Sequence, residues 1–207
     1  MKFIQKGEPS VSQRPSRPTP DAPGSPWRTH RATEVYRNPW ITVTEYQVTR
    51  PDGAPGLYGV VDPGDNATIV ALSADGLVWM IKDFIYPIQR RAWVLPSGAV
   101  EAGEDPLTAA QRELLEATGV RAARWERLGA FYLSPGILPQ RSYLYLARDL
   151  AVGAAQREGA EQAMIARAIP LGEAYATCLR ESEAAGSAAV TALGLWLARA
   201  RLADEDV

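Results

Sequence analysis

The chain has 207 residues, of which 46% are hydrophobic and 22% charged, and its formal net charge is −2. This length predicts one substantial domain with its own core, and the slightly acidic charge gives no basis for binding nucleic acid. The single cysteine, Cys178, and single histidine, His30, exclude an internal disulfide and a multi-cysteine metal site, which leaves carboxylates, arginines and backbone groups for any chemistry.

Residues 1–27 are rich in Pro, Ser and Arg. Such a segment buries too little apolar surface to offset its ordering entropy, so we expect a disordered leader followed by one domain over residues 28–207. The N-terminus lacks the apolar core of a secretory signal, and no apolar run is long enough to span a bilayer. These features predict a cytoplasmic protein without a membrane partner.

Short β-branched and alternating segments predict strands, and turn residues separate several of them. Ala74-Asp75-Gly76 stands between two such segments and predicts a hairpin. Helices are predicted over 106–118, 173–183 and 188–202, the last capped by Ser187. Strands mixed with few helices, in no regular βαβ order, indicate an α+β fold or an α/β/α sandwich. The predicted strands cover residues 40–49, 57–62, 67–73, 77–85, 123–133, 141–150 and 164–171.

The helix over residues 106–118 carries the most informative polar pattern. Asp105 is a suitable N-cap, Pro106 occupies the favoured first position, and Gly119 follows the last turn. On a helix, Glu113 and Glu116 lie about 60° apart, so both carboxylates can converge on one point. Arg112 can reach Glu116 at i+4 and orient its carboxylate.

A tight segment with the sequence LPSG, residues 95–98, precedes this helix and can place a main-chain carbonyl near Ser97 beside the two carboxylates. Oxygen ligands with positions left open for water and phosphate are typical of a Mg²⁺ or Mn²⁺ site. Such a cation neutralises phosphate charge and acidifies a water molecule, as hydrolysis of a phosphoanhydride requires. The alternative is a solvated surface helix without a ligand.

The stretch GAVEAGEDPLTAAQRELLEATGV, residues 98–120, resembles the Nudix box, G-x(5)-E-x(7)-R-E-U-x-E-E-x-G-U, where U is a bulky aliphatic residue. Ala117 alone departs from this pattern, because it stands where the second glutamate of the pair belongs. The matching positions are Gly98, Glu104, Arg112, Glu113, Leu114, Glu116, Gly119 and Val120.

The segments WVLPSG, SPG and AIPLGEA resemble the ADP-ribose pyrophosphatase branch of that family. The resemblance implies a Nudix-type α/β/α sandwich with a mixed sheet, Mg²⁺ or Mn²⁺, and a homodimer. It also implies hydrolysis of a nucleoside diphosphate linked to another moiety, such as ADP-ribose or a nucleotide sugar. Glu113, Glu116 and Ser97 are then metal ligands, and Arg112 orients Glu116. Arg90 and Arg91 match positions where this branch has arginines facing phosphate.

Three positions depart from what the branch carries. Ala117 removes one metal-binding carboxylate, Gln140 replaces an acid after SPG, and Gln162 replaces one member of an acid pair whose other member is Glu161. An amide cannot act as a general base near neutral pH. Glu161, Glu158 or a water held by Glu113 would then supply the base. Two alternatives are an eroded domain that binds a nucleotide ligand or protein without turnover, and a specialised reaction on an unusual diphosphate.

Overall fold

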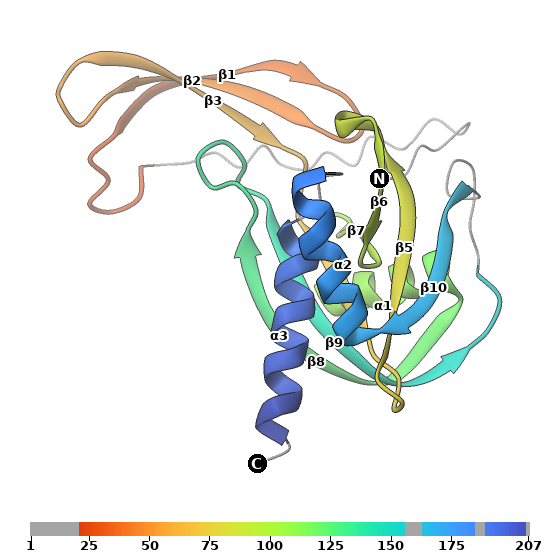
Figure 1. Cartoon of the computed structure of the whole chain (residues 1–207). Coiled ribbons are helices and arrows are strands. Elements are labelled where there is room, and N and C mark those ends of the chain that lie inside the picture. The colour runs from red at the N-terminus through yellow and green to blue at the C-terminus, as the bar shows by residue number, and fades with distance from the viewer. Residues whose placement is uncertain (1–20, 156–162, 185–188, 206–207) are drawn as a thin grey trace. The chain divides into compact units, whose positions relative to one another are not determined.

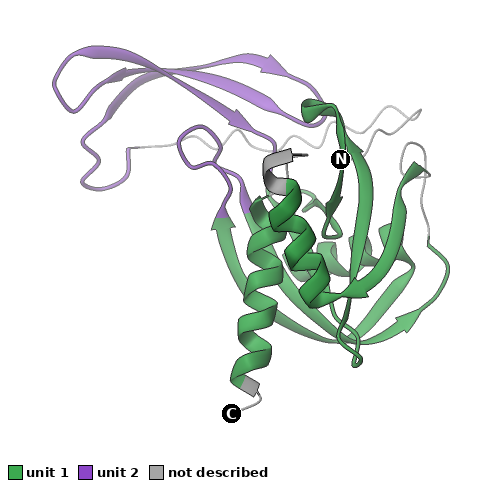
Figure 2. Ribbon diagram, viewed as in Figure 1, with its two compact units in different colours: residues 1–5, 65–131, 142–207 green, residues 6–64, 132–141 purple. Residues whose placement is uncertain are grey.

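The computed structural model describes residues 21–155, 163–184 and 189–205 (Figure 1). Two compact units contain them (Figure 2). Unit 1 holds the described residues of 65–131 and 142–205, and unit 2 holds residues 21–64 and 132–141. Residues 1–20 of the predicted leader lie outside the described residues. That residues 28–207 act as one domain stays a prediction.

Unit 2 is built on one antiparallel three-stranded sheet, in the order β1-β2-β3. The strands are β1 (Arg28–Arg37), β2 (Thr42–Thr49) and β3 (Pro55–Asp62). Sequence patterning predicts β2 and β3 but misses β1. Most of the β1 side chains are exposed, so no apolar alternation marks the strand, and its pairing with β2 is what forms it.

Unit 1 contains two sheets, with strand orders β10-β5-β6 and β7-β4-β9-β8. The second sheet is mixed, because β4 pairs parallel to β9 and antiparallel to β7. A short 3₁₀ helix, η1 (Tyr86–Ile88), separates β5 from β6. The strands are β4 (Asn66–Ala71), β5 (Leu77–Ile85), β6 (Arg90–Val94), β7 (Ser97–Ala99), β8 (Val120–Tyr132), β9 (Arg141–Val152) and β10 (Ile165–Pro170).

Three helices cover the sheets of unit 1: α1 (Pro106–Thr118), α2 (Leu171–Ala184) and α3 (Ala189–Glu205). Alternation along β4 directs Ile69 into a core with α1 and Val70 into a separate core with α2 and α3. The central strand therefore has a helical layer on each face, and the predicted α/β/α sandwich with a mixed sheet is confirmed.

The predicted helix over 106–118 is confirmed, and those over 173–183 and 188–202 correspond to α2 and α3. The predicted cap Ser187 lies outside the described residues. The hairpin prediction at Ala74-Asp75-Gly76 is wrong in one respect. The turn forms, and the Ser73 N–H donates to the Leu77 carbonyl at 2.9 Å beside an isolated bridge between Leu72 and Val78, but β4 and β5 belong to different sheets. None of the helices in the described residues is long and apolar enough to cross a membrane.

Gly119 ends α1 with a φ of 76°, in the left-handed region that glycine adopts without strain. A Cβ built there would lie 2.5 Å from the carbonyl oxygen of Gly153. We therefore expect Gly119→Ala to lower the free energy of unfolding by about 1–3 kcal/mol, measured by urea denaturation. Gly172→Ala in α2 is the matched control. No atom lies within 4 Å of its added methyl group, so this variant should be neutral or stabilising.

Candidate functional site

Local sequence fixes where α1 begins and ends. The Asp105 side chain accepts hydrogen bonds from the backbone N–H groups of Leu107 and Thr108, at 2.9 and 3.2 Å. Pro106 begins the helix where no intrahelical hydrogen bond is lost. The N–H of Gly119 donates to the Leu115 carbonyl at 2.8 Å and closes the last turn. These caps hold the polar residues of the helix in fixed register.

Glu113 is buried, with a residue exposure of 7%, although an acid on a surface helix is usually solvated. Its carboxyl group lies against the α-carbon of Gly98 in β7, and a Cβ on residue 98 would overlap it. Residue 98 must therefore be glycine for this carboxylate to approach β7 closely. The absence of a side chain on Gly98 thus leaves the space that the Glu113 carboxyl group occupies.

Arg112 connects three parts of the site. Its Nε and Nη2 atoms donate to the two carboxylate oxygens of Glu104, both at 3.0 Å, and Nη2 also donates to the Ala99 carbonyl at 3.0 Å. Nη1 donates to Glu113 Oε1 at 2.5 Å. The planar guanidinium thus ties the loop before α1 to β7 and to the buried carboxylate.

The two carboxylates raise the pKa of Arg112 above its ordinary value. The hydrogen bond with Glu104 is the largest cause, burial opposes it, and the hydrogen bond and charge of Glu113 add to the increase. Because an arginine side chain stays protonated in proteins, the clamp keeps its positive charge at every pH at which the fold survives.

Glu116 lies one turn beyond Arg112, and its Oε2 atom is 3.5 Å from Arg112 Nη1. Glu113 and Glu116 therefore meet at the same guanidinium nitrogen. The sequence prediction that Arg112 orients Glu116 stays a prediction, since Arg112 donates its hydrogen bonds to Glu104, Glu113 and the Ala99 carbonyl.

Across residues 21–155, 163–184 and 189–205, no group of three His, Cys, Asp or Glu side chains is arranged to hold a metal ion. What the structure offers is two converging carboxylates on α1 and the backbone of β7 beside them. Oxygen donors of this kind suit Mg²⁺ or Mn²⁺, which keep several waters. Half-buried Ala117 lies about 40° around the helix from Glu113, where a glutamate would add a third carboxylate.

Ser97 begins β7 directly before Gly98, and the approach to it is fixed from the central strand. The Pro96 carbonyl accepts the N–H of Ile69 at 2.9 Å, and Ser97 pairs with Thr68 in β4. The backbone of Ser97 therefore adjoins Gly98, against which the Glu113 carboxyl group lies. A main-chain carbonyl ligand from this segment is compatible with the position of Glu113.

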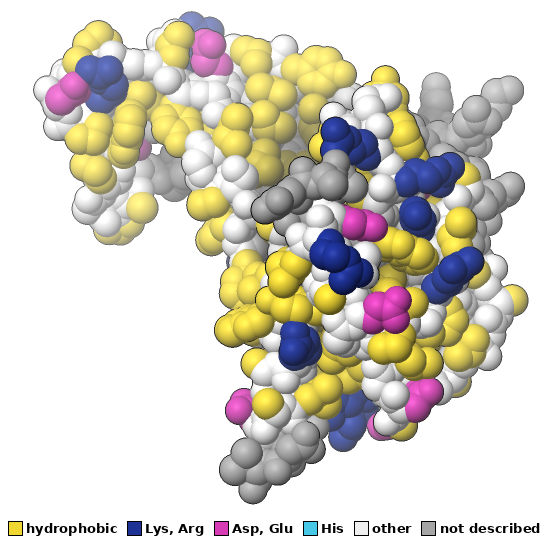
Figure 3. All heavy atoms as spheres, in the orientation of Figure 1, with side chains coloured by type: hydrophobic (Ala, Val, Ile, Leu, Met, Phe, Trp, Pro, Cys, Tyr) yellow, Lys and Arg dark blue, Asp and Glu magenta, His cyan; other side chains and the backbone are white. Residues whose placement is uncertain are grey.

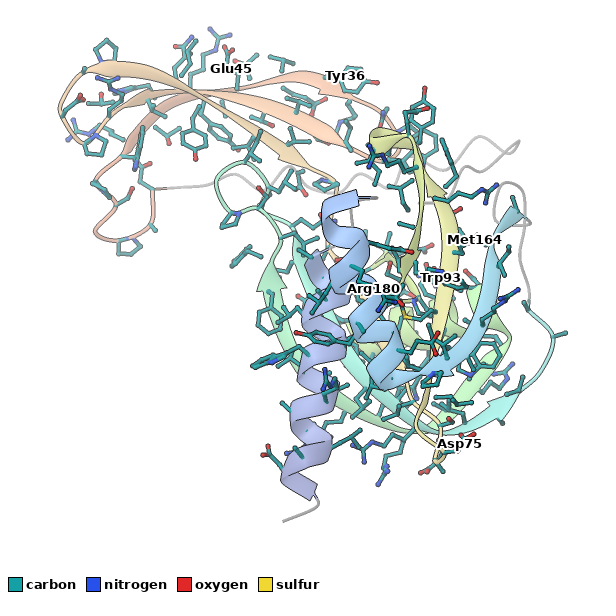
Figure 4. All side chains as sticks on the ribbon, viewed as in Figure 1. Tyr36, Glu45, Asp75, Trp93, Met164 and Arg180 are labelled. Carbon is teal, nitrogen blue, oxygen red and sulfur yellow. The ribbon has the colours of Figure 1, made fainter. Side chains whose placement is uncertain are left out.

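Arg90 and Arg91 are both exposed and open β6. As consecutive residues of a strand, they leave opposite faces of the sheet. Trp93 packs against the core that contains α2 residues (Figure 4), so Arg91, two residues earlier, shares the α2 face. Arg90 extends from the other face of the sheet. Trp79 lies on that same face and packs against the core that contains α1 residues. On the side drawn in Figure 3, Lys and Arg side chains gather over unit 1.

Of the predicted positions Gln140, Glu158, Glu161 and Gln162, the structure describes Gln140. Gln140 lies in unit 2, where its carbonyl accepts the N–H of Leu133 at 3.3 Å. Glu158, Glu161 and Gln162 lie outside the described residues. Sequence reasoning matches Glu104 to the motif and expects it to stabilise the loop or the outer shell of the metal, and it misses the Ala99 carbonyl. The eight-residue separation of Glu104 from Arg112 gives no helical-spacing signal, because a turn and a cap intervene.

Unit 2 has a surface groove of about 460 Å³ on its sheet. It contains His30, whose Nε2 lies 2.7 Å from Thr49 Oγ1, and it contains no carboxylate. The groove therefore has none of the oxygen donors that characterise the α1 cluster. The groove residues are His30, Gln47, Val48, Pro55, Gly56 and Leu57.

Two protein-family models and a solved structure match this chain. The protein-family model for the NUDIX domain matches residues 62–192, and that for the nucleoside diphosphate sugar hydrolase N-terminal domain matches residues 27–61. A solved structure described as an ADP compounds hydrolase superposes with a TM-score of 0.74 at 20% identity. The match covers 86% of this chain and 95% of that one.

Two curated relatives are named ADP-ribose pyrophosphatase. The Bacillus subtilis protein is 30% identical over 60% of this chain and 68% of its own length. The Mycobacterium tuberculosis protein is 33% identical over 65% of this chain and 66% of its own length. The similarity thus spans about two thirds of each relative.

Removing the guanidinium should destabilise unit 1, because the buried Glu113 carboxylate would lose its charge-assisted hydrogen bond with Arg112. We expect Arg112→Met to lower the free energy of unfolding by about 2–4 kcal/mol in urea denaturation. Arg37→Met is the control, because Arg37 pairs with Glu34 on the exposed surface and should change stability little. Equal losses in the two variants would contradict a structural role for the Arg112 clamp.

Proposed function

Because this chain belongs to the Nudix family, we propose that it hydrolyses the pyrophosphate of a nucleoside diphosphate linked to another moiety. The observation that carries the proposal is the meeting of Glu113 and Glu116 at Arg112 Nη1, next to a glycine that leaves room for the Glu113 carboxyl group. The relatives' names favour ADP-ribose or a nucleotide sugar as the substrate class.

A divalent cation, Mg²⁺ or Mn²⁺, is held in this proposal by Glu113, Glu116 and a main-chain carbonyl at Ser97. When bound, such an ion neutralises phosphate charge and lowers the pKa of a coordinated water. The protein positions the donors: Gly98 admits the Glu113 carboxylate, and Arg112 fixes its oxygen through a charge-assisted hydrogen bond. Glu161 is the proposed general base, with Glu158 and a water held by Glu113 as the alternatives.

Ala117 sets how strongly the cation is held. A site with two side-chain carboxylates carries less negative charge than one with three, so its affinity for a divalent cation is lower. Substrate phosphate oxygens then complete the coordination. An eroded domain that binds nucleotide without turnover is the second candidate, and Ala117 is the observation that favours it.

The assembly we propose is a cytoplasmic homodimer. Unit 2 supports this proposal, because its sheet exposes several large apolar side chains that a monomer leaves in water (Figure 4 labels Tyr36 on β1). Burial of such a surface is a common reason for self-association. The exposed residues are Val35, Tyr36, Leu57 and Tyr58 on the strands and Trp40 in the connection between β1 and β2.

The carboxylates are tested by hydrolysis of a panel of ADP-ribose, nucleotide sugars and dinucleotides with Mg²⁺ or Mn²⁺, followed by monophosphate release. We expect turnover in the native chain and a loss on the order of 100-fold in Glu113→Gln and Glu116→Gln, since each removes a charged ligand. Glu45→Gln, on the unit 2 sheet (Figure 4), is the control and should retain activity.

Substitution of Ala117 separates the two candidate functions. Ala117→Glu should lower the Mg²⁺ concentration for half-maximal activity by about tenfold, because it adds a carboxylate beside Glu113. A native chain without turnover, combined with an active Ala117→Glu variant, would support the eroded domain. Two inactive proteins with measurable ADP-ribose binding would also contradict hydrolysis.

The opposite faces of β6 predict different roles for its two arginines. Arg90→Ala should raise the KM for the best substrate by about tenfold, as expected for loss of one charge-assisted contact with phosphate. Arg91→Ala, on the α2 face, should leave KM close to native. Steady-state kinetics check both values, and an equal rise in the two variants would rule out the assignment by face.

A further inference from the structure

The N–H of Leu95 donates to the Thr191 hydroxyl across 96 positions of sequence, at 3.2 Å. Thr191 is 1% exposed and lies in the first turn of α3, well outside the motif that contains the carboxylates. Leu95 follows the end of β6 and comes two residues before β7, where the segment beside Glu113 starts. A side chain from the C-terminal helix therefore holds the backbone that enters the candidate site.

The backbone N–H of Leu95 is a buried donor that needs an acceptor from outside the sheet. Leu95 is 1% exposed, and it stands between β6 and β7, outside both strand ladders. The next residue, Pro96, has no backbone N–H and so offers no neighbouring donor that could hold the segment in place of Leu95. A buried backbone donor without an acceptor is costly, so the Thr191 hydroxyl satisfies a group that the sheet leaves over.

Packing reinforces the hydrogen bond. A Cβ built on Gly194, one turn further along α3, would lie only 2.7 Å from Leu95 Cδ1. On the other side of the segment, the Pro96 carbonyl accepts the N–H of Ile69 in β4 at 2.9 Å. The Leu95-Pro96 pair is thus held between α3 and the central strand.

We propose that Thr191 is a positioning residue for the metal site, acting through Leu95 and Pro96 on the backbone of Ser97 and Gly98. This inference rests on the proposed function, in which that backbone supplies a ligand. With Ala117 in place of a third carboxylate, the main-chain oxygen provides a larger share of the coordination. A segment that moves would therefore weaken cation binding more here than in a site with three carboxylates.

Manganese binding to the metal-free protein, measured by isothermal titration calorimetry, tests the proposal without relying on turnover. Thr191→Val keeps the side-chain volume and removes the acceptor, and it should raise the Mn²⁺ Kd by about tenfold. Thr191→Ser keeps the hydroxyl and should restore a near-native Kd. Gly194→Ala leaves the hydrogen bond but pushes on Leu95, and it should also weaken binding.

Leu202→Ala is the matched control for a general loss of stability. Leu202 packs against the same core and lies eleven residues, about 16 Å, further along α3 than Thr191. This variant should unfold at lower temperature while its Mn²⁺ Kd stays near the native value. Hydrogen exchange at the Leu95 amide reports separately whether Thr191→Val has released the backbone.

The outcomes separate the two proposals. A native Mn²⁺ Kd in both Thr191→Val and Gly194→Ala, with faster exchange at Leu95, would overturn the positioning role and leave the proposed metal site intact. An equal weakening in Leu202→Ala would overturn it as well, by assigning the effect to stability. A native protein that binds neither Mn²⁺ nor Mg²⁺ would contradict the metal site itself and, with it, this inference.

Discussion

The arrangement around α1 depends on one charged group that is partly removed from water. Arg112 has donor groups in three directions, and each meets an acceptor that the fold supplies: Glu104, the Ala99 carbonyl and Glu113. A buried carboxylate without such a partner would be expensive, and a buried guanidinium without carboxylates equally so. The charge and hydrogen bonds of each group therefore offset the cost of removing the other from water. Together they fix the spacing between the loop, the helix and β7.

The central strand β4 extends this constraint to the rest of unit 1. Its alternating side chains give one face to α1 and the other to α2 and α3. The helix on the first face, α1, contains the two carboxylates. On the second face, α3 contains Thr191, which accepts the hydrogen bond from Leu95. Since interiors pack densely, a displacement on one face is transmitted to the other instead of being absorbed locally.

Sequence patterning predicts the parts of this structure that depend on local chemistry. The bounds of α1 follow from Asp105, Pro106 and Gly119, each of which acts within one helical turn. The burial of Glu113 does not follow from the sequence, because helical spacing alone gives no signal for the contact with Gly98. Likewise, the exposed residues of β1 carry no alternation, and the bond from Leu95 to Thr191 joins distant segments. These features depend on tertiary contacts that no short window of sequence contains.

The parallel pairing of β4 with β9 has a consequence for synthesis of the chain. Residues 66–71 pair with residues 142–147, and the whole helix α1 lies between these two segments in the sequence. The core that receives α1 contains Tyr143, Tyr145 and Ala147 of β9. A nascent chain that has not yet extended beyond β9 can form the α1 helix but lacks much of the surface on which it docks. The carboxylates of α1 thus reach their final places only after a late, long-range strand pairing, which is intrinsically slow.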